Sequence, residues 1–106
     1  MADALKYSPE ALNDLDSIFD YITFELKEPG IAEHLINNIL AQHDKLKEFP
    51  GIGAIYKLPN GVETVYRYLV YKDYLSFYRV ENSTIYIDRV LNGRTDYLGV
   101  LFGKLS

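Results

Sequence analysis

The chain has 106 residues, 48% of them hydrophobic and 25% charged, which predicts one globular domain spanning residues 1–106. It contains no cysteine, no apolar run near the roughly 20 residues of a membrane helix and no signal peptide, so we expect a cytoplasmic protein without disulfides or a membrane segment. The net charge of −4 is not typical of a protein that attracts nucleic acid over long distances.

The N-terminal half predicts two helices. Residues 4–7 alternate weakly and predict a short strand, after which Ser8 supplies an N-cap hydroxyl and Pro9 occupies the first helical position. Apolar residues then recur at steps of three and four until the break at residues 28–30, and a second helix is expected from about Ile31 to Phe49. A break this short predicts an antiparallel helical hairpin.

The two histidines, His34 and His43, both lie on the second predicted helix. Their spacing of nine residues, at 100° per residue, places them on opposite faces of that helix. This spacing excludes a shared metal site, so we expect no metal and no cofactor. Each histidine is expected to be solvated or satisfied by hydrogen bonds.

After Gly53 the apolar period changes from that of a helix to that of a strand. Strands are predicted over residues 54–58, 62–71, 74–80 and 84–91, joined by short turns. The last three form an antiparallel meander, one face of which the helices must cover. The predicted fold class is therefore α+β: an N-terminal antiparallel helical hairpin packed on one face of a twisted, mainly antiparallel sheet of three or four strands.

Both faces of this predicted sheet carry apolar side chains. Tyr66 and Tyr68 alternate with Val65 and Leu69, so neither face is polar. A single layer of helices cannot cover both faces, and exposed aromatic surface of this kind usually marks a binding site. We expect the second face to be covered by the tail at residues 97–102, by another chain, or by both.

The segments YSPEALNDLDSIFDYI, LKEFPGIG and YLSFYRVENSTIYIDRVLNGRTDY resemble the RelE/ParE superfamily of bacterial toxins over nearly the whole chain. The resemblance implies the toxin of a type II toxin–antitoxin, or plasmid stabilisation, module that a cognate antitoxin binds and silences. It also implies a helical hairpin on a twisted antiparallel sheet. Operator DNA would be contacted only indirectly, through the antitoxin.

The superfamily divides by target: members like RelE cut messenger RNA on the ribosome, whereas members like ParE poison DNA gyrase. RelE-like cleavage relies on a dense cluster of lysines and arginines on the open face of the sheet. Here the position of the catalytic sheet arginine falls on Leu75, and the expected lysines fall on or near Tyr66 and Tyr68. The resemblance is therefore closer to ParE, a binder without catalysis. A ribosome-dependent mRNA endoribonuclease is the alternative, with Arg94 as phosphate clamp and Tyr97 as general acid or base.

The resemblance also implies two contact regions. DNA gyrase is expected to be contacted by Arg94, Tyr97, Leu98, Leu101 and Phe102. The antitoxin is expected to be contacted by Arg67, Tyr71, Leu75, Phe77, Arg79 and Arg89. From the residues alone, Arg79 and Arg89 have a second interpretation, as partners of Glu81, Asp88 or acids on the helices. Asp96 is a close neighbour that is expected to hold Arg94 in place.

Overall fold

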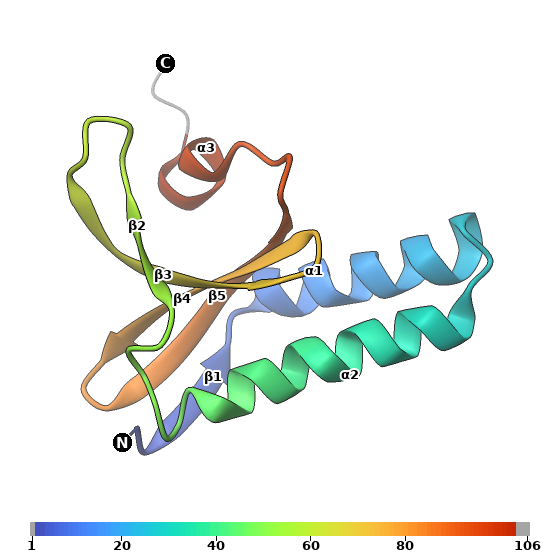
Figure 1. The fold of residues 1–106 in the computed structure, drawn as a ribbon, viewed down its shortest axis with the longest axis horizontal. Coiled ribbons are helices and arrows are strands. Elements are labelled where there is room, and N and C mark those ends of the chain that lie inside the picture. Colours follow the sequence, from blue (N-terminus) through green and yellow to red (C-terminus); the bar gives the residue numbers. More distant parts are fainter. Residues whose placement is uncertain (1, 104–106) are drawn as a thin grey trace.

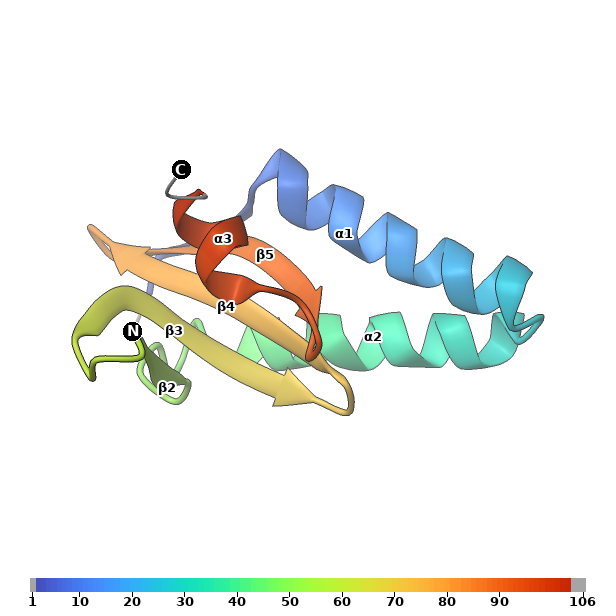
Figure 2. The same cartoon turned by 90° about the horizontal axis from the view of Figure 1, so that it is seen from above.

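The computed structural model describes residues 2–103. Helices α1 and α2 form an antiparallel hairpin against one face of a sheet, and the short helix α3 lies over the opposite face (Figures 1 and 2). The predicted α+β class is confirmed. The elements are, in chain order, β1 (Ala4–Tyr7), α1 (Pro9–Asp20), the π-helical turn η1 (Tyr21–Glu25), α2 (Pro29–Lys45), β2 (Ala54–Lys57), β3 (Glu63–Tyr71), β4 (Tyr74–Glu81), β5 (Thr84–Asn92) and α3 (Tyr97–Phe102).

The sheet has five strands in the order β1-β5-β4-β3-β2. Strands β2 to β5 are antiparallel neighbours, as the meander predicts, whereas β1 pairs with β5 in parallel, Ala4 lying opposite Thr84. The expected count of three or four strands was wrong. Hydrophobic periodicity shows that a segment is a strand, but it does not show that a four-residue strand joins a partner at the other end of the chain.

Two sets of hydrogen bonds fix the start of α1, one within the helix and one to strand β5. As predicted, Ser8 is the N-cap, its hydroxyl accepting a hydrogen bond of 2.9 Å from the Ala11 N–H, and Pro9 opens the helix. The same hydroxyl donates to the Asp88 carbonyl at 2.7 Å, and the Ser8 N–H donates to the Ile87 carbonyl at 3.0 Å. The Ser-Pro pair therefore both begins the helix and ties it to strand β5.

The helical hairpin extends past the sheet at its tip (Figure 1). Helix α2 begins at Pro29, earlier than predicted, because proline is favourable at a first helical position. It ends at Lys45 rather than Phe49, and turns follow it. Since the tip has no sheet beneath it, apolar residues there such as Phe24 and Leu26 are exposed.

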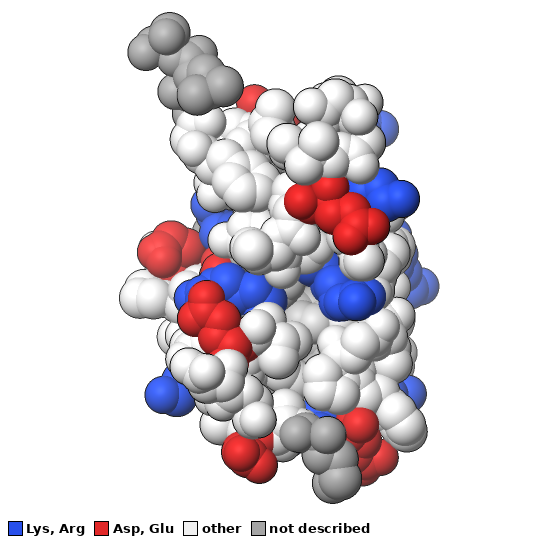
Figure 3. Space-filling model, turned by 90° about the vertical axis from the view of Figure 1, so that its left-hand side faces the viewer, with Lys and Arg blue, Asp and Glu red and all other residues white. Residues whose placement is uncertain are grey.

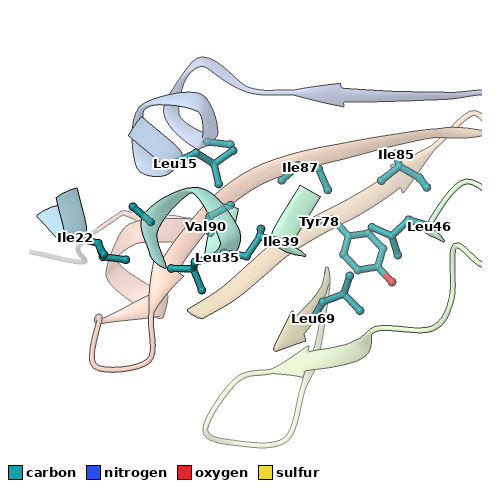
Figure 4. Packing of buried hydrophobic residues seen from close by; sticks show 12 residues of the cluster. Leu15, Ile22, Leu35, Ile39, Leu46, Leu69, Tyr78, Ile85, Ile87 and Val90 are labelled. Atoms are coloured by element: carbon teal, nitrogen blue, oxygen red, sulfur yellow. The ribbon is translucent and has the colours of Figure 1, made fainter. Parts of the chain in front are cut away.

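The core lies between the hairpin and the sheet, and Figure 4 shows its side chains meeting there. Burying a large apolar side chain contributes about 1.5–3 kcal/mol, so this cluster holds the two layers together. Tyr78 of β4 and Ile39 of α2 are each fully buried. The labelled members of the cluster are Leu15, Ile22, Leu35, Ile39, Leu46, Leu69, Tyr78, Ile85, Ile87 and Val90.

The hydroxyl of the buried Tyr78 is satisfied by the loop that follows α2. It donates to the Pro50 carbonyl at 2.7 Å and accepts from the Gly53 N–H at 2.9 Å. A Cβ atom on Gly53 would lie 2.6 Å from the Tyr78 ring and hydroxyl, and 2.9 Å from the Tyr68 carbonyl oxygen. The glycine that ends the segment LKEFPGIG therefore has a packing reason: only glycine lets the loop approach this tyrosine.

His43 lies in the core, whereas His34 is exposed. The Nδ1 atom of His43 is 2.8 Å from the Tyr7 hydroxyl, and its Nε2 atom is 2.7 Å from the Ser76 hydroxyl. Burial lowers the pKa of His43 from 6.5 to about 4, although the nearby Asp44 carboxylate acts in the opposite direction. The expectation that each histidine is solvated or satisfied by hydrogen bonds is confirmed, and His43 links β1, α2 and β4.

Candidate functional site

The face of the sheet opposite the hairpin, here called the open face, is built around an aromatic cluster. Phe77 of β4 lies at its centre and is fully buried. Its ring centroid lies 5.1 Å from that of Tyr97, 5.5 Å from that of Tyr56 and 5.9 Å from that of Tyr68. Aromatic pairs at these separations each contribute about 0.5–1.5 kcal/mol. The middle of the open face is therefore apolar.

Helix α3 rests on this cluster through its two ends. Tyr97 packs on Phe77, and the Phe102 ring lies 5.7 Å from the Tyr66 ring. The tail thus covers part of the second face, as expected, yet Leu98 and Phe102 remain 38% and 47% exposed. Asp96 was expected to hold Arg94, but its carboxylate instead accepts the Gly99 N–H at 3.1 Å and caps α3.

A β-bulge interrupts strand β5 at Asp88, whose carboxylate lies on the open face. Phe77 lies opposite Arg89 and Tyr78 lies opposite Ile87, so Asp88 is the additional residue in β5. Ile87 faces the core, so regular alternation already turns Asp88 to the open face, and the bulge shifts the residues after it, so that Val90 again faces the core. Period-two alternation in the sequence cannot show the change.

The Asp88 carboxylate accepts hydrogen bonds from side chains of two other strands, β4 and β3. It accepts a hydrogen bond of 2.8 Å from the Arg79 Nε atom and one of 3.0 Å from the Tyr66 hydroxyl. Burial, and then the Asp88 carboxylate, raise the pKa of Tyr66 to about 12. Arg79 also pairs with Glu81 at 2.8 Å and stacks over the Tyr86 ring, its Cζ atom 4.3 Å from the centroid.

Arg89 reaches α1. Its Nε and Nη2 atoms donate to the two Asp14 carboxylate oxygens at 2.7 and 2.8 Å, and the Val90 N–H adds a third bond of 2.9 Å to the same carboxylate. Bidentate pairing of this kind fixes the relative position of the two side chains as well as compensating their charges. The alternative interpretation of Arg79 and Arg89, as partners of nearby acids, is confirmed. Their contact with an antitoxin stays a prediction.

The other residues expected to contact the antitoxin do not share one surface. Arg67 donates to the Gly53 carbonyl at 2.8 Å and so supports the loop after α2. Tyr71 packs on the core side, where its hydroxyl accepts a hydrogen bond of 2.8 Å from Asn38. Phe77 lies under α3 on the opposite face. Leu75 lines a pocket with Lys72 and Arg94.

Arg94 and Tyr97 have different surroundings. Arg94 is exposed in the turn after β5, where its N–H donates to the Asn92 side chain at 3.0 Å, and it borders a pocket of about 360 Å³. Tyr97 belongs to the aromatic cluster, and burial, followed by Tyr56 and Tyr68, raises its pKa. A raised pKa disfavours the deprotonated form that a general base requires.

Sequence reasoning missed a groove between α3 and the β2–β3 hairpin. The groove has a volume of about 740 Å³ and is mainly apolar. The only signal in the sequence was the excess of apolar residues on the second face, because the position of the tail on the sheet is set by tertiary packing. The lining residues are Leu58, Glu63, Thr64, Val65, Asp96, Leu98, Gly99, Phe102 and Gly103.

Charge does not gather into a patch of one sign on the side of the molecule drawn in Figure 3, where acidic and basic side chains alternate among uncharged ones. Within residues 2–103, no helix is long and apolar enough to cross a membrane. In the same part of the chain, no group of three His, Asp or Glu side chains is placed to hold a metal ion.

The family model described as ParE toxin of type II toxin-antitoxin system, parDE, matches residues 5–97. A solved structure from the chromosomal ParDE TA system of P. aeruginosa is similar, with a TM-score of 0.69 and 26% identity, over 84% of this chain and 94% of that chain. No protein with a curated description matches significantly. Since the family match covers most of the sequence, this chain belongs to the ParE toxin family of type II toxin–antitoxin systems.

Proposed function

We propose that this ParE-family toxin acts in the cytoplasm by binding and poisoning DNA gyrase, and that a cognate antitoxin silences it by binding. The observation that supports a binder over a nuclease is the make-up of the open face. Its centre is filled by Phe77, Tyr56, Tyr68 and Tyr97, where RNA cleavage would require cations.

The charges around that centre also disfavour cleavage of RNA. Cutting RNA at the 2′-hydroxyl requires a base, a leaving-group acid and positive charge to stabilise the phosphate. Arg79 and Arg89 are each neutralised by a carboxylate of this chain, Asp88 and Asp14. Beside Arg94, the pocket that this alternative would use is lined by one further described cation, Lys72.

The surface proposed to meet gyrase lies around α3. Leu98 and Phe102 are exposed apolar side chains, and Arg94 adds an exposed cation. Tyr97 anchors the helix, and Leu101 borders a small pocket beside Arg79 and Arg89. A few aromatic, aliphatic and arginine side chains commonly dominate the energy of a protein–protein interface.

A supercoiling assay tests the proposal. Purified toxin at micromolar concentration is added to gyrase and relaxed plasmid, and we expect loss of supercoiling with accumulation of cleaved DNA. Phe102→Ala and Arg94→Ala should weaken the effect, whereas Phe24→Ala should not, because Phe24 is an equally large exposed side chain at the far tip of the hairpin.

Normal supercoiling at that concentration would refute the gyrase proposal. Mapping messenger RNA ends after expression of the toxin addresses the alternative. Cuts inside ribosome-bound codons that vanish in Arg94→Ala would establish the ribonuclease instead.

A further inference from the structure

The groove between α3 and the β2–β3 hairpin exposes apolar surface that this chain does not cover. Val65 is 72% exposed, and Leu98 and Phe102 face it across the groove. The volume of about 740 Å³ lies within the roughly 300–1,000 Å³ typical of binding sites. Exposed apolar surface gathered into one recess marks an interaction site more strongly than scattered apolar residues do.

The rim of the groove is acidic. Glu63 and Asp96 line it, and among the residues 2–103 that the structure describes, no lysine or arginine lines the groove. Within the part of the chain that the structure describes, Glu63 forms no ion pair, whereas Arg79 and Arg89 on the same sheet are both paired. The groove therefore suits an apolar side chain that carries a basic residue beside it.

The acidic rim also argues against a second copy of this chain as the occupant. A symmetric contact through the groove would bring Glu63 and Asp96 of both copies together, and like charges repel. A recess between a hairpin and a helix admits one segment of chain. This favours a thin helical or extended segment over the folded surface of a large target.

We propose that this groove binds the cognate antitoxin, taking an apolar side chain from one segment of it and placing an adjacent lysine or arginine against Glu63. The inference rests on the proposed silencing by an antitoxin, and it names how silencing works. Because Leu98 and Phe102 belong both to the groove and to the surface proposed to meet gyrase, an antitoxin seated there blocks the target directly.

Two pairs of variants test the groove. Val65→Asp places a charge on its apolar floor, and Val70→Asp is the control, on the same strand, 55% exposed and outside the groove lining. Glu63→Lys reverses the charge of one residue at the rim of the groove. Its control is Glu33→Lys on α2, since Glu33 is exposed and lies outside the groove. Melting curves confirm that each variant folds.

The measurement is the affinity of the purified toxin for its cognate antitoxin, obtained by co-expression and separation. We expect Val65→Asp and Glu63→Lys each to weaken binding about tenfold or more, and both controls to stay within about twofold. Replacing each lysine and arginine of the antitoxin with glutamate in turn should then identify one change that restores binding to Glu63→Lys.

The outcomes separate the inference from the proposed function. Wild-type toxin that does not bind the antitoxin would overturn both the proposed silencing and the inference, whereas the gyrase proposal is tested separately by the supercoiling assay. Wild-type binding that is indifferent to Val65→Asp and Glu63→Lys would overturn the inference alone. If Val65→Asp changed only the oligomeric mass of the toxin without antitoxin, the inference would also be overturned, because the groove would then bind a second copy of this chain. An effect confined to gyrase inhibition would indicate the target as occupant.

Discussion

Protonation of His43 is expected to weaken the fold as the pH falls. The unfolded chain protonates this histidine near pH 6.5, whereas the folded chain does so only near its lowered pKa of about 4. Between these values the unfolded state binds more protons, so the free energy of unfolding decreases as pH falls. The stabilisation is complete above pH 6.5 and is lost on the way to pH 4.

The size of the effect follows from the two pKa values. Each pH unit between them is worth about 1.4 kcal/mol, so the interval from 6.5 to about 4 predicts a loss of about 3 kcal/mol. That is a large share of the roughly 5–15 kcal/mol that stabilises a typical domain. Its structural origin is the burial of the imidazole between the Tyr7 and Ser76 hydroxyls, an effect larger than the opposing one of the nearby Asp44 carboxylate.

Urea unfolding at a series of pH values between 7.5 and 4 measures the effect, with far-ultraviolet circular dichroism as the probe. His43→Gln keeps a polar side chain but removes the titrating group, so its stability should fall by about 3 kcal/mol less than that of the wild type over this range. His34→Gln, which removes an exposed histidine from the same helix, should follow the wild type. Parallel curves for wild type and His43→Gln would refute the reasoning.

Two other substitutions test single contacts by thermal and urea unfolding. Gly53→Ala should destabilise the fold by about 1–3 kcal/mol, because its Cβ would collide with Tyr78, whereas Gly51→Ala, whose Cβ meets nothing within 4 Å, should change little. Asp14→Asn should lower the free energy of unfolding by about 2 kcal/mol, because it breaks the bidentate pair with Arg89, and its control Asp16→Asn, at an exposed position, should change it by no more than about 0.5 kcal/mol. Equal effects of a substitution and its control would contradict the contact concerned.

Local chemistry made much of the fold predictable. Ser8 and Pro9 mark the start of α1, because an N-cap hydroxyl and a first-turn proline act within a few residues of their own position. Period-two alternation likewise located β3, β4 and β5. The stripe of the first helix was only partly informative: Leu15 is buried, but Leu12 is 51% exposed, and the small neighbouring Ala11 is buried in its stead.

The candidate site was less predictable, because its features arise between elements. The sequence left Arg79 and Arg89 open between a partner and nearby acids, and only the folded chain shows that Asp88 pairs with the first and Asp14 of α1 with the second. The excess of apolar residues on the second face was visible in the sequence. The groove was not, because it depends on where α3 comes to rest relative to the β2–β3 hairpin.

The pairing of β1 with β5 has a consequence for how the toxin is made. Ala4 meets Thr84, so the first strand has no partner until nearly the entire polypeptide has been synthesised. Contacts between such distant parts of a sequence form slowly, since a long loop must close before they stabilise anything. A nascent or prematurely terminated product lacking β5 cannot complete this sheet, so the fold is confined to chains that the ribosome has almost finished.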